Sequence, residues 1–406
     1  MPRDCFVAFV TETGDGHDFL RNAMEKGASC AVVSKADHSI SLPQFVCEDT
    51  SAALEKFARF ARAKFCGTTI AITGSFGKTT TKEILKLLLG VKNNATFENK
   101  NGKIGIPMTL AALVDSENFA IIEVGIDAPG TVDGYIDMIM PNIAIVTGIG
   151  KIHIGGMVSE EAIACEKCKL PAYAVKNGGF GILAEECARF ECFRTLGNGC
   201  IGISRGGKEH GYEIDDVGGQ YNITLAFDGQ SFKFALPNSM SRGTAKNFIL
   251  ACVCAMKLGV SVELVRERIL QWRPAKWRGE IIVSGNKTYF ADCYNANPIA
   301  MADSLEHFDR LFPNCGRMFV IGALKTSEIG ASVDDENEKI FQNLPIRNND
   351  TVVIVGENSP RLRKNIKSND VIAVQTTANA MKYVKNFSGV VYLKGHRSYE
   401  LEKLLP

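Results

Sequence analysis

The hydrophobic positions of this chain fall into short apolar runs that alternate with amphipathic stretches. This order is typical of strands and helices that follow one another in an α/β fold. A first series covers residues 1–66, and a second, larger series starts at the apolar run over residues 69–73. Because helical stretches separate the strands, we expect largely parallel sheets with right-handed crossovers.

The individual elements follow from the same pattern. In the first series we predict strands at 5–10 and 30–34 and helices at 17–26 and 50–65. In the second series we predict strands at 69–73, 120–124, 143–147, 179–183 and 200–203. Glycine, proline and polar clusters between these runs mark the connecting loops.

Beyond residue 212 the pattern changes to short alternating strands. Residues 221–227 and 232–236 flank Asp228-Gly229, a dipeptide that favours the tight turn of a hairpin. Apolar helices are expected over 245–258 and from 262, and residues 273–279 have the character of a domain crossing. A third α/β series follows, with predicted strands at 287–292, 317–321, 351–355 and 390–393.

The composition is that of an ordinary folded protein, with 46% hydrophobic and 22% charged residues among 406. A net charge of +1 without basic runs argues against nucleic acid or a membrane surface as a partner. The N-terminus lacks a signal pattern, and no apolar stretch is long enough to span a bilayer. We therefore expect a cytoplasmic protein that inserts into no membrane, and we also expect it to be a monomer.

Thirteen cysteines are scattered through strand-like and helix-like segments. Such scatter favours reduced, buried thiols over a disulfide framework. Cys165 and Cys168 have the spacing of a metal or redox pair, but they fall within a predicted helix. The nearest other cysteines, Cys187 and Cys192, lack this spacing, so a structural role is favoured for the pair.

The segment over residues 69–82 carries the clearest chemistry. An apolar strand breaks into a glycine turn and then enters an amphipathic helix from Lys78 to about Leu89. The turn lets backbone N–H groups approach phosphate oxygens, and Lys78 adds a point charge at the helix N-terminus. Thr79 is placed to bind Mg²⁺, as in P-loop enzymes. The predicted nucleoside triphosphate site comprises Gly74, Ser75, Gly77, Lys78, Thr79 and Thr80.

Glu123 ends the apolar run Phe119-Ala-Ile-Ile-Glu123. A carboxylate at the C-terminal edge of a parallel strand, beside the phosphate loop, is well placed to share Mg²⁺ with Thr79. Without its surroundings, Glu123 could equally be a solvated surface residue.

Several further motifs occur in an order that resembles the Mur ligase family over almost the whole chain. The resemblance implies three domains: a truncated N-terminal α/β substrate domain of the UDP type (1–66), a central P-loop ATPase domain (67–275) and a C-terminal Rossmann-like ligase domain (276–406). The motifs are Asn99-Lys-Asn101 with Ile104-Gly-Ile-Pro107, Glu123-Val-Gly125, Glu161-x-Ile-Ala-x-x-Lys167, Asp292-Cys-Tyr-Asn-Ala-Asn-Pro298 and Lys394-Gly-His-Arg397.

The family joins a carboxylate to an amine with ATP, through an acyl phosphate, and releases ADP and phosphate. The resemblance therefore implies small-molecule carboxylate and amine substrates, the amine being an amino acid or dipeptide. It also implies ATP and two Mg²⁺ ions as cofactors, because two anions must be held against each other.

The resemblance assigns roles to residues that the phosphate loop does not include. His153 matches a ligand of a second Mg²⁺, and Lys167 matches a lysine that reacts with CO₂ to give an anionic carbamate. Arg278 can fork onto phosphate oxygens if domain closure brings it in. The implied metal ligands are Thr79, Glu123, His153 and Lys167, and the implied catalytic residues are Lys78, His153, Lys167 and Arg278. The implied nucleotide contacts beyond the loop are Asn247, Arg278, Asp292, Asn295 and Asn297.

Some positions depart from the family pattern, mainly on the substrate side. Gly148 replaces an asparagine, Gly243 a histidine and His396 a serine. The opening Asp-Ser-Arg segment of the uridine-nucleotide domain is missing, so we expect a shortened first domain.

Three functions stay open from the sequence. Tyr294-Asn-Ala-Asn-Pro298 is specific to the branch that adds D-alanyl-D-alanine to a UDP-linked muramoyl tripeptide. The departures favour a related ligase that acts on a pseudomurein peptide or a nickel-tetrapyrrole precursor instead. The third reading is a non-catalytic nucleotide-binding paralogue, and the persistence of the nucleotide and metal residues argues against it.

Overall fold

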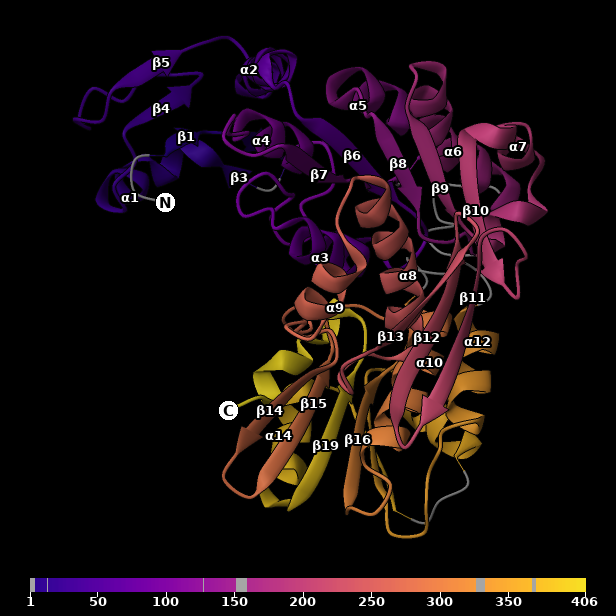
Figure 1. Cartoon of the computed structure of the whole chain (residues 1–406). Coiled ribbons are helices and arrows are strands. Elements are labelled where there is room, and N and C mark those ends of the chain that lie inside the picture. The colour runs from indigo at the N-terminus through magenta and orange to yellow at the C-terminus, as the bar shows by residue number, and fades with distance from the viewer. Residues whose placement is uncertain (1–3, 13, 127, 151–158, 326–332, 367–369) are drawn as a thin grey trace.

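The computed structural model describes residues 4–12, 14–126, 128–150, 159–325, 333–366 and 370–406. Three larger sheets of three, eight and six strands follow one another along the described part of the chain, each with its own helices, and a fourth, two-stranded sheet accompanies the first (Figure 1). The predicted α/β class and mostly parallel sheets are confirmed. None of the helices in the described part of the chain is long and apolar enough to cross a membrane.

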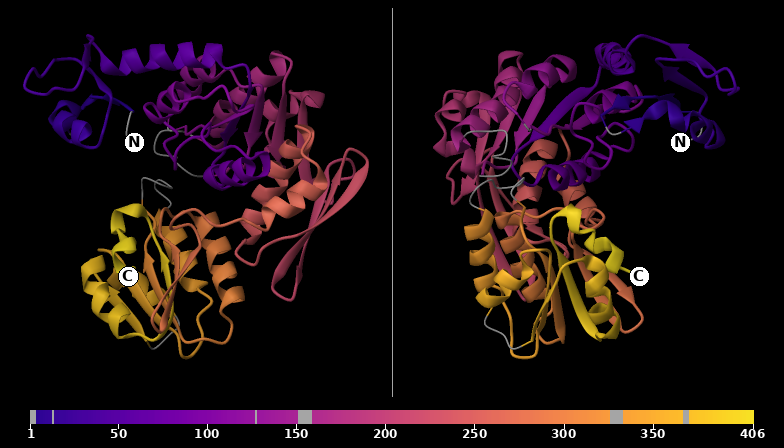
Figure 2. Two further views of the ribbon diagram at one scale, coloured as in Figure 1. Left: turned by 60° about the vertical axis from the view of Figure 1, so that its left-hand side comes forward. Right: turned by 180° about the vertical axis from the view of Figure 1, so that it is seen from behind.

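The first unit is a small parallel sheet in the order β1-β4-β5. Asp49 caps α2 by accepting hydrogen bonds from the N–H groups of Ser51 and Ala52. The helix then packs against α4 of the central unit (Figure 2). The elements are β1 (Cys5–Val7), β2 (Val10–Thr11), β3 (Gly14–Asp15), α1 (Leu20–Glu25), β4 (Cys30–Val33), β5 (Gln44–Val46) and α2 (Thr50–Lys64).

Two predictions for this unit are wrong in detail. The strand expected over 5–10 ends at Val7, because β2 turns back and pairs with β3 instead of continuing β1. The helix expected over 17–26 starts as the 3-10 turn Gly16–Phe19 before α1 begins. The edge strand β5 was not predicted, and its apolar side chains Phe45 and Val46 are exposed.

The central sheet has the order β13-β12-β11-β10-β9-β8-β6-β7. The five predicted parallel strands and the hairpin at Asp228-Gly229 are confirmed, whereas β11 was not predicted. The strands are β6 (Thr68–Thr73), β7 (Phe119–Glu123), β8 (Ile143–Val146), β9 (Phe180–Ala184), β10 (Cys200–Arg205), β11 (Gly211–Val217), β12 (Gln220–Phe227) and β13 (Gln230–Ala235).

Helices cover both faces of this sheet because successive residues of its buried strands point to opposite sides. Ile70 and Ile72 of β6 pack with α3 and α8, whereas Ala71 packs with α4, α5 and α6. The helices are α3 (Lys78–Leu89), α4 (Gly105–Ala111), α5 (Thr131–Ile139), α6 (Glu160–Lys176), α7 (Glu191–Arg194), α8 (Arg242–Lys257) and α9 (Val262–Ile269). Short 3-10 turns occupy Glu185–Arg189 and Gly197–Gly199.

The C-terminal sheet has the order β14-β15-β19-β16-β17-β18, and only β14 is antiparallel to its neighbour. The four predicted strands are confirmed, and the outer strands β14 and β18 were not predicted. The strands are β14 (Glu280–Ser284), β15 (Lys287–Asp292), β16 (Arg317–Gly322), β17 (Thr351–Val355), β18 (Val371–Val374) and β19 (Gly389–Lys394). The helices are α10 (Pro298–Leu311), α12 (Val333–Gln342), α13 (Ser359–Leu362) and α14 (Thr377–Asn386), with 3-10 turns at Arg363–Asn365, Arg397–Tyr399 and Leu401–Leu404.

The cysteines are all free, but their expected burial is wrong for some. Cys165 lies on α6, as predicted, yet it is exposed while Cys168 is buried. Cys5, Cys66 and Cys315 are exposed as well. Among the described residues, no group of three or more candidate ligands has the geometry of a metal site.

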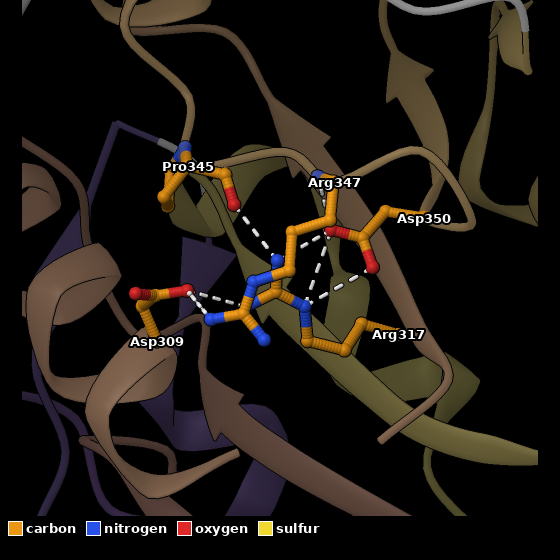
Figure 3. Close-up of polar contacts among 5 residues, drawn as sticks. All are labelled: Asp309, Arg317, Pro345, Arg347 and Asp350. Atoms are coloured by element: carbon orange, nitrogen blue, oxygen red, sulfur yellow. Dashed lines mark hydrogen bonds and ion pairs between the residues drawn. The ribbon is translucent and has the colours of Figure 1, made fainter. Parts of the chain in front are cut away.

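A buried arginine anchors the start of β16 (Figure 3). The Arg317 side chain is fully buried, and its Nε lies 3.1 Å from Oδ1 of Asp350. Its Nη1 donates to Asp309 at 2.6 Å, and its Nη2 donates to the carbonyl of Pro345 at 2.8 Å. Such a network is costly to break, because the remaining charge would be buried without compensation.

We expect Asp350→Ala to destabilise the protein by about 3–5 kcal/mol, because it leaves the Arg317 guanidinium without its main buried partner. Urea unfolding followed by circular dichroism measures this loss. Arg347→Ala is the control, since Arg347 is 40% exposed and its ion pair with Asp309 should contribute about 1 kcal/mol or less. Equal losses in the two variants would contradict the assignment.

Candidate functional site

The phosphate loop connects β6 to α3 as predicted. Gly77, the residue before α3, has a φ of 77°, and a Cβ there would lie 2.4 Å from Oδ1 of Asn247. Glycine is therefore required both by the backbone conformation and by the approach of Asn247. Nζ of Lys78 lies over the loop, 2.8 Å from the carbonyl oxygen of Gly74. The N–H groups of the first turn of α3 face the same cleft as this cation.

Glu123 lies beside this loop because the sheet register pairs it with Ile72 of β6. The residue is 1% exposed, and its Oε1 accepts hydrogen bonds from Thr79 Oγ1 at 3.0 Å and Asn101 Nδ2 at 2.6 Å. Its buried Oε2 has no hydrogen-bond partner among the described residues, and Nζ of Lys82 is 4.0 Å away. A buried carboxylate with an unused oxygen next to a threonine hydroxyl fits a small divalent cation such as Mg²⁺.

A cleft of about 910 Å³ runs between the central and C-terminal units at this point. It brings most of the predicted site residues together, although they come from the loop between β6 and α3, from α3, β7 and α8, and from the start of the third unit. The predicted residues that line it are Ser75, Gly77, Lys78, Thr79, Thr80, Glu123, Asn247, Arg278, Asp292, Asn295 and Asn297.

The C-terminal wall of the cleft is held by local contacts. The Arg278 guanidinium lies 4.2 Å from the centre of the Tyr294 ring, and Asp292 accepts a hydrogen bond from Nζ of Lys394 at 2.6 Å. Asn297 caps α10 by accepting from the N–H of Ala300 at 2.8 Å. Asn297 is therefore the N-cap of α10. This cap uses only Oδ1, and the Nδ2 group is a separate donor that a ligand can contact.

Asn295 is also engaged locally, since its Oδ1 accepts from the N–H of Ala296 at 2.9 Å. Both asparagines therefore use their carbonyl oxygens within the protein. Each amide also carries an Nδ2 group with two N–H donors.

Lys167 is 4% exposed on α6, and it is not among the described residues that line the cleft. The half-exposed neighbour Lys169 binds Asp133 at 2.7 Å and Glu166 at 2.8 Å. Hydrogen bonds that Lys169 donates to Asp133 and then to Glu166 raise the pKa of Lys169, so it remains a cation. Of these two lysines, Lys167 has the buried position. His153 lies outside the described residues.

The cleft is also lined by charged residues that the sequence analysis did not identify as candidates. Glu185 accepts hydrogen bonds from Nζ of Lys246 at 2.6 Å and from the Tyr212 hydroxyl at 3.0 Å. Burial raises the pKa of Glu185, whereas hydrogen bonds from Lys246 and from the N–H of Arg205 lower it. The lowering effect is the larger one in sum, so the pKa of Glu185 lies below its usual value. No motif signals these residues, because they converge only when β11 and α8 pack together.

His307 of α10 also lines the cleft, and it is 3% exposed. Burial first, and then the nearby Arg310 charge, lower its pKa from 6.5 to about 3. The unfolded chain therefore binds an extra proton between these pH values, so stability falls as pH falls through this range. We expect a loss of about 1.4 kcal/mol per pH unit below about 6.5.

Urea unfolding midpoints at pH 7.5 and pH 5.5 measure this effect. His307→Gln removes the titration, so its midpoint should fall less between the two pH values than that of the unchanged protein. The same fall in both proteins would show that other groups carry the acid sensitivity.

The fold and the cleft define a class of protein: a P-loop nucleotide-binding enzyme whose site is shared between two α/β units. Two sequence families match in the same order as these units. The Mur ligase middle domain matches residues 72–255, and the Mur ligase glutamate ligase domain matches residues 277–397.

Individual relatives agree with the family matches. A UDP-N-acetylmuramoyl-tripeptide–D-alanyl-D-alanine ligase from Synechocystis is 31% identical over 341 residues, which cover 79% of this chain and 70% of the relative. The enzyme of the same name from Haemophilus influenzae is 27% identical over 98% of this chain and 89% of its own. A structure of MurF from Acinetobacter baumannii has a TM-score of 0.82 and 25% identity, covering 100% of this chain and 90% of that one.

The chain belongs to the Mur ligase family and is a MurF-like, ATP-dependent ligase that forms C–N bonds.

Proposed function

We propose that this protein joins D-alanyl-D-alanine to the terminal carboxylate of a UDP-N-acetylmuramoyl tripeptide, as a cytoplasmic monomer in peptidoglycan synthesis. One observation supports the proposal most directly. The phosphate loop and Glu123 face Arg278 and Asp292 of another unit across one cleft. The names of the relatives from Synechocystis and Haemophilus influenzae supply the substrates.

The reaction needs two displacements. A carboxylate oxygen of the tripeptide attacks the terminal phosphorus of ATP, so ADP leaves and an acyl phosphate forms. The amine of the dipeptide then attacks the acyl carbon, phosphate leaves with the bonding electrons, and the amine loses a proton. Exclusion of water is essential, because water would hydrolyse the acyl phosphate.

The residues of this chain have distinct roles in the proposal. Lys78 and the loop N–H groups hold the β- and γ-phosphates, and Arg278 approaches the transferred phosphoryl group from the third unit. Asn247 contacts the loop from α8. Asp292, Asn295 and Asn297 hold the nucleoside from the C-terminal side of the cleft.

The buried geometry of Glu123 and Thr79 fits one Mg²⁺, and we assign His153 and a carbamate on Lys167 to a second. Bound Mg²⁺ would neutralise charge on the phosphates as the two anions approach. Lys167 could form a carbamate only as the neutral amine, because CO₂ reacts with an unprotonated nitrogen.

Mass spectrometry of the products tests the proposal. The protein is incubated with ATP, Mg²⁺, UDP-N-acetylmuramoyl tripeptide and D-alanyl-D-alanine, with L-alanyl-L-alanine as the control amine. We expect the pentapeptide product only with the D,D-dipeptide. If the tripeptide gives no product while a different carboxylate supports ADP formation, the protein is a ligase but the proposed substrates are wrong.

A further inference from the structure

A contact that has no role in the proposed reaction joins α10 of the C-terminal unit to the N-terminus of α8. Oδ2 of Asp303 accepts a hydrogen bond from Ser241 Oγ at 2.6 Å, and Oδ1 accepts from the N–H of Gly243 at 2.7 Å. Ser241 is itself the N-cap of α8, and its Oγ accepts from the N–H of Thr244. A carboxylate therefore supplements the cap of a long helix from another unit, where the helix dipole favours negative charge.

The same face of α10 contacts the central unit at its other end. Arg310 follows Asp303 by seven residues, which places both side chains on one face of the helix. Nη2 of Arg310 donates to the carbonyl of Met240 at 2.9 Å, and its guanidinium lies 4.4 Å from the centre of the Tyr221 ring. The contact through Asp303 is thus part of a docked helix face and does not stand alone.

Gly243 leaves the space that the carboxylate occupies. A Cβ at this position would lie 2.7 Å from Oδ2 and 3.0 Å from Cγ of Asp303. Any side chain here would push Asp303 away from α8. The backbone of Gly243 is helical, a conformation in which glycine is generally less favourable than alanine.

The contact belongs to the wall of the same cleft, which Gly243 and Asp303 both line, and it lies one helical turn from Asn247. Asn247 follows Gly243 by four residues on α8, and its Oδ1 closely approaches Gly77 in the phosphate loop. The chain of contacts therefore runs from Asp303 through the first turn of α8 to the loop.

We propose that Asp303 is a positioning residue that docks the C-terminal unit on the N-terminus of α8 and thereby sets Asn247 against the phosphate loop. This inference rests on the proposed nucleotide site. It also explains why residue 243 is a glycine: any side chain at this position would occupy the space of the Asp303 carboxylate.

Binding of ADP with Mg²⁺ by isothermal titration calorimetry tests the proposal in four proteins: the unchanged chain, Asp303→Ala, Gly243→Ala and the double variant. We expect each single substitution to weaken ADP binding by about tenfold, since coupling of this kind is commonly 5–150-fold. The double variant should bind no more weakly than Asp303→Ala, because the added methyl group then meets no carboxylate.

Asp303→Asn provides the conservative rescue. The amide oxygen can still accept from Gly243, and the amide nitrogen can donate to Ser241, so ADP affinity should lie closer to that of the unchanged protein. Small-angle X-ray scattering without nucleotide should show a larger radius of gyration for Asp303→Ala than for the asparagine variant.

Two results would overturn the inference. One is an unchanged ADP affinity in Asp303→Ala, and the other is an equal effect of Gly243→Ala with and without the carboxylate. Absence of ADP binding by the unchanged chain would instead contradict the nucleotide site, so the two failures are distinguishable.

Discussion

Lys78→Ala is expected to lower the turnover of the ligase by about a hundredfold or more. The Lys78 ammonium group lies over the phosphate loop at the N-terminus of α3. In the proposed mechanism, charge builds up on the transferred phosphoryl group at this place. A neutral side chain cannot stabilise that charge, and the loop N–H groups alone do not replace it. The rate of ADP formation at saturating substrates measures the loss.

Lys86→Ala is the matched control on the same helix, because Lys86 lies in the last turn of α3, two turns from the loop. We expect its rate to stay within about twofold of the unchanged protein. Near-normal turnover of Lys78→Ala would reject the proposed role of the loop.

Lys167→Ala should also lower turnover by about a hundredfold or more, since it removes the proposed carbamate from the second metal site. Short carboxylic acids such as acetate can enter the vacated space and supply an anionic oxygen. We therefore expect added acetate to restore part of the rate in a concentration-dependent manner. The unchanged protein should show no such activation.

Lys169→Ala controls for the position on α6. Lys169 is half-exposed and pairs with Asp133 and Glu166, so its loss should cost about 1 kcal/mol of stability or less and leave the rate almost unchanged. Full activity of Lys167→Ala would show that this lysine is not the carbamate-forming residue.

The buried strands could be predicted from the sequence because their apolar runs are continuous. The runs at β6, β7 and β8 are each covered by helices on both faces, so almost every position is buried and the centre of each run is apolar. The missed strands lie outside this environment. In β11 and β14 alternate or successive positions are exposed, and their short polar-apolar patterns resemble those of loops.

The nucleotide loop was also predictable, because a strand, two glycines, a lysine and a threonine at fixed spacing are local in sequence. The contacts that adjust the site are not local. Gly148 has a φ of 148°, and a Cβ there would lie 2.6 Å from the Phe76 ring. Glycine in place of asparagine at position 148 therefore leaves room for the Phe76 ring of the phosphate loop, and only the folded structure reveals this contact.

The reason for Gly243, at the boundary between the central and C-terminal units, is likewise visible only in the folded structure. In the sequence it is a missing histidine, whereas in the structure it is the space for Asp303. Residues 60 positions apart cannot be paired by periodicity, since periodicity reports only which face of an element is buried.

Phosphate release from ATP tests the central claim most directly. The assay contains Mg²⁺, D-alanyl-D-alanine and UDP-N-acetylmuramoyl tripeptide, and each component is withheld in turn. We predict rapid release only when all are present, because the acyl phosphate turns over only when the amine attacks it. Release at the same rate without either substrate, or no release from the complete mixture, would contradict the account.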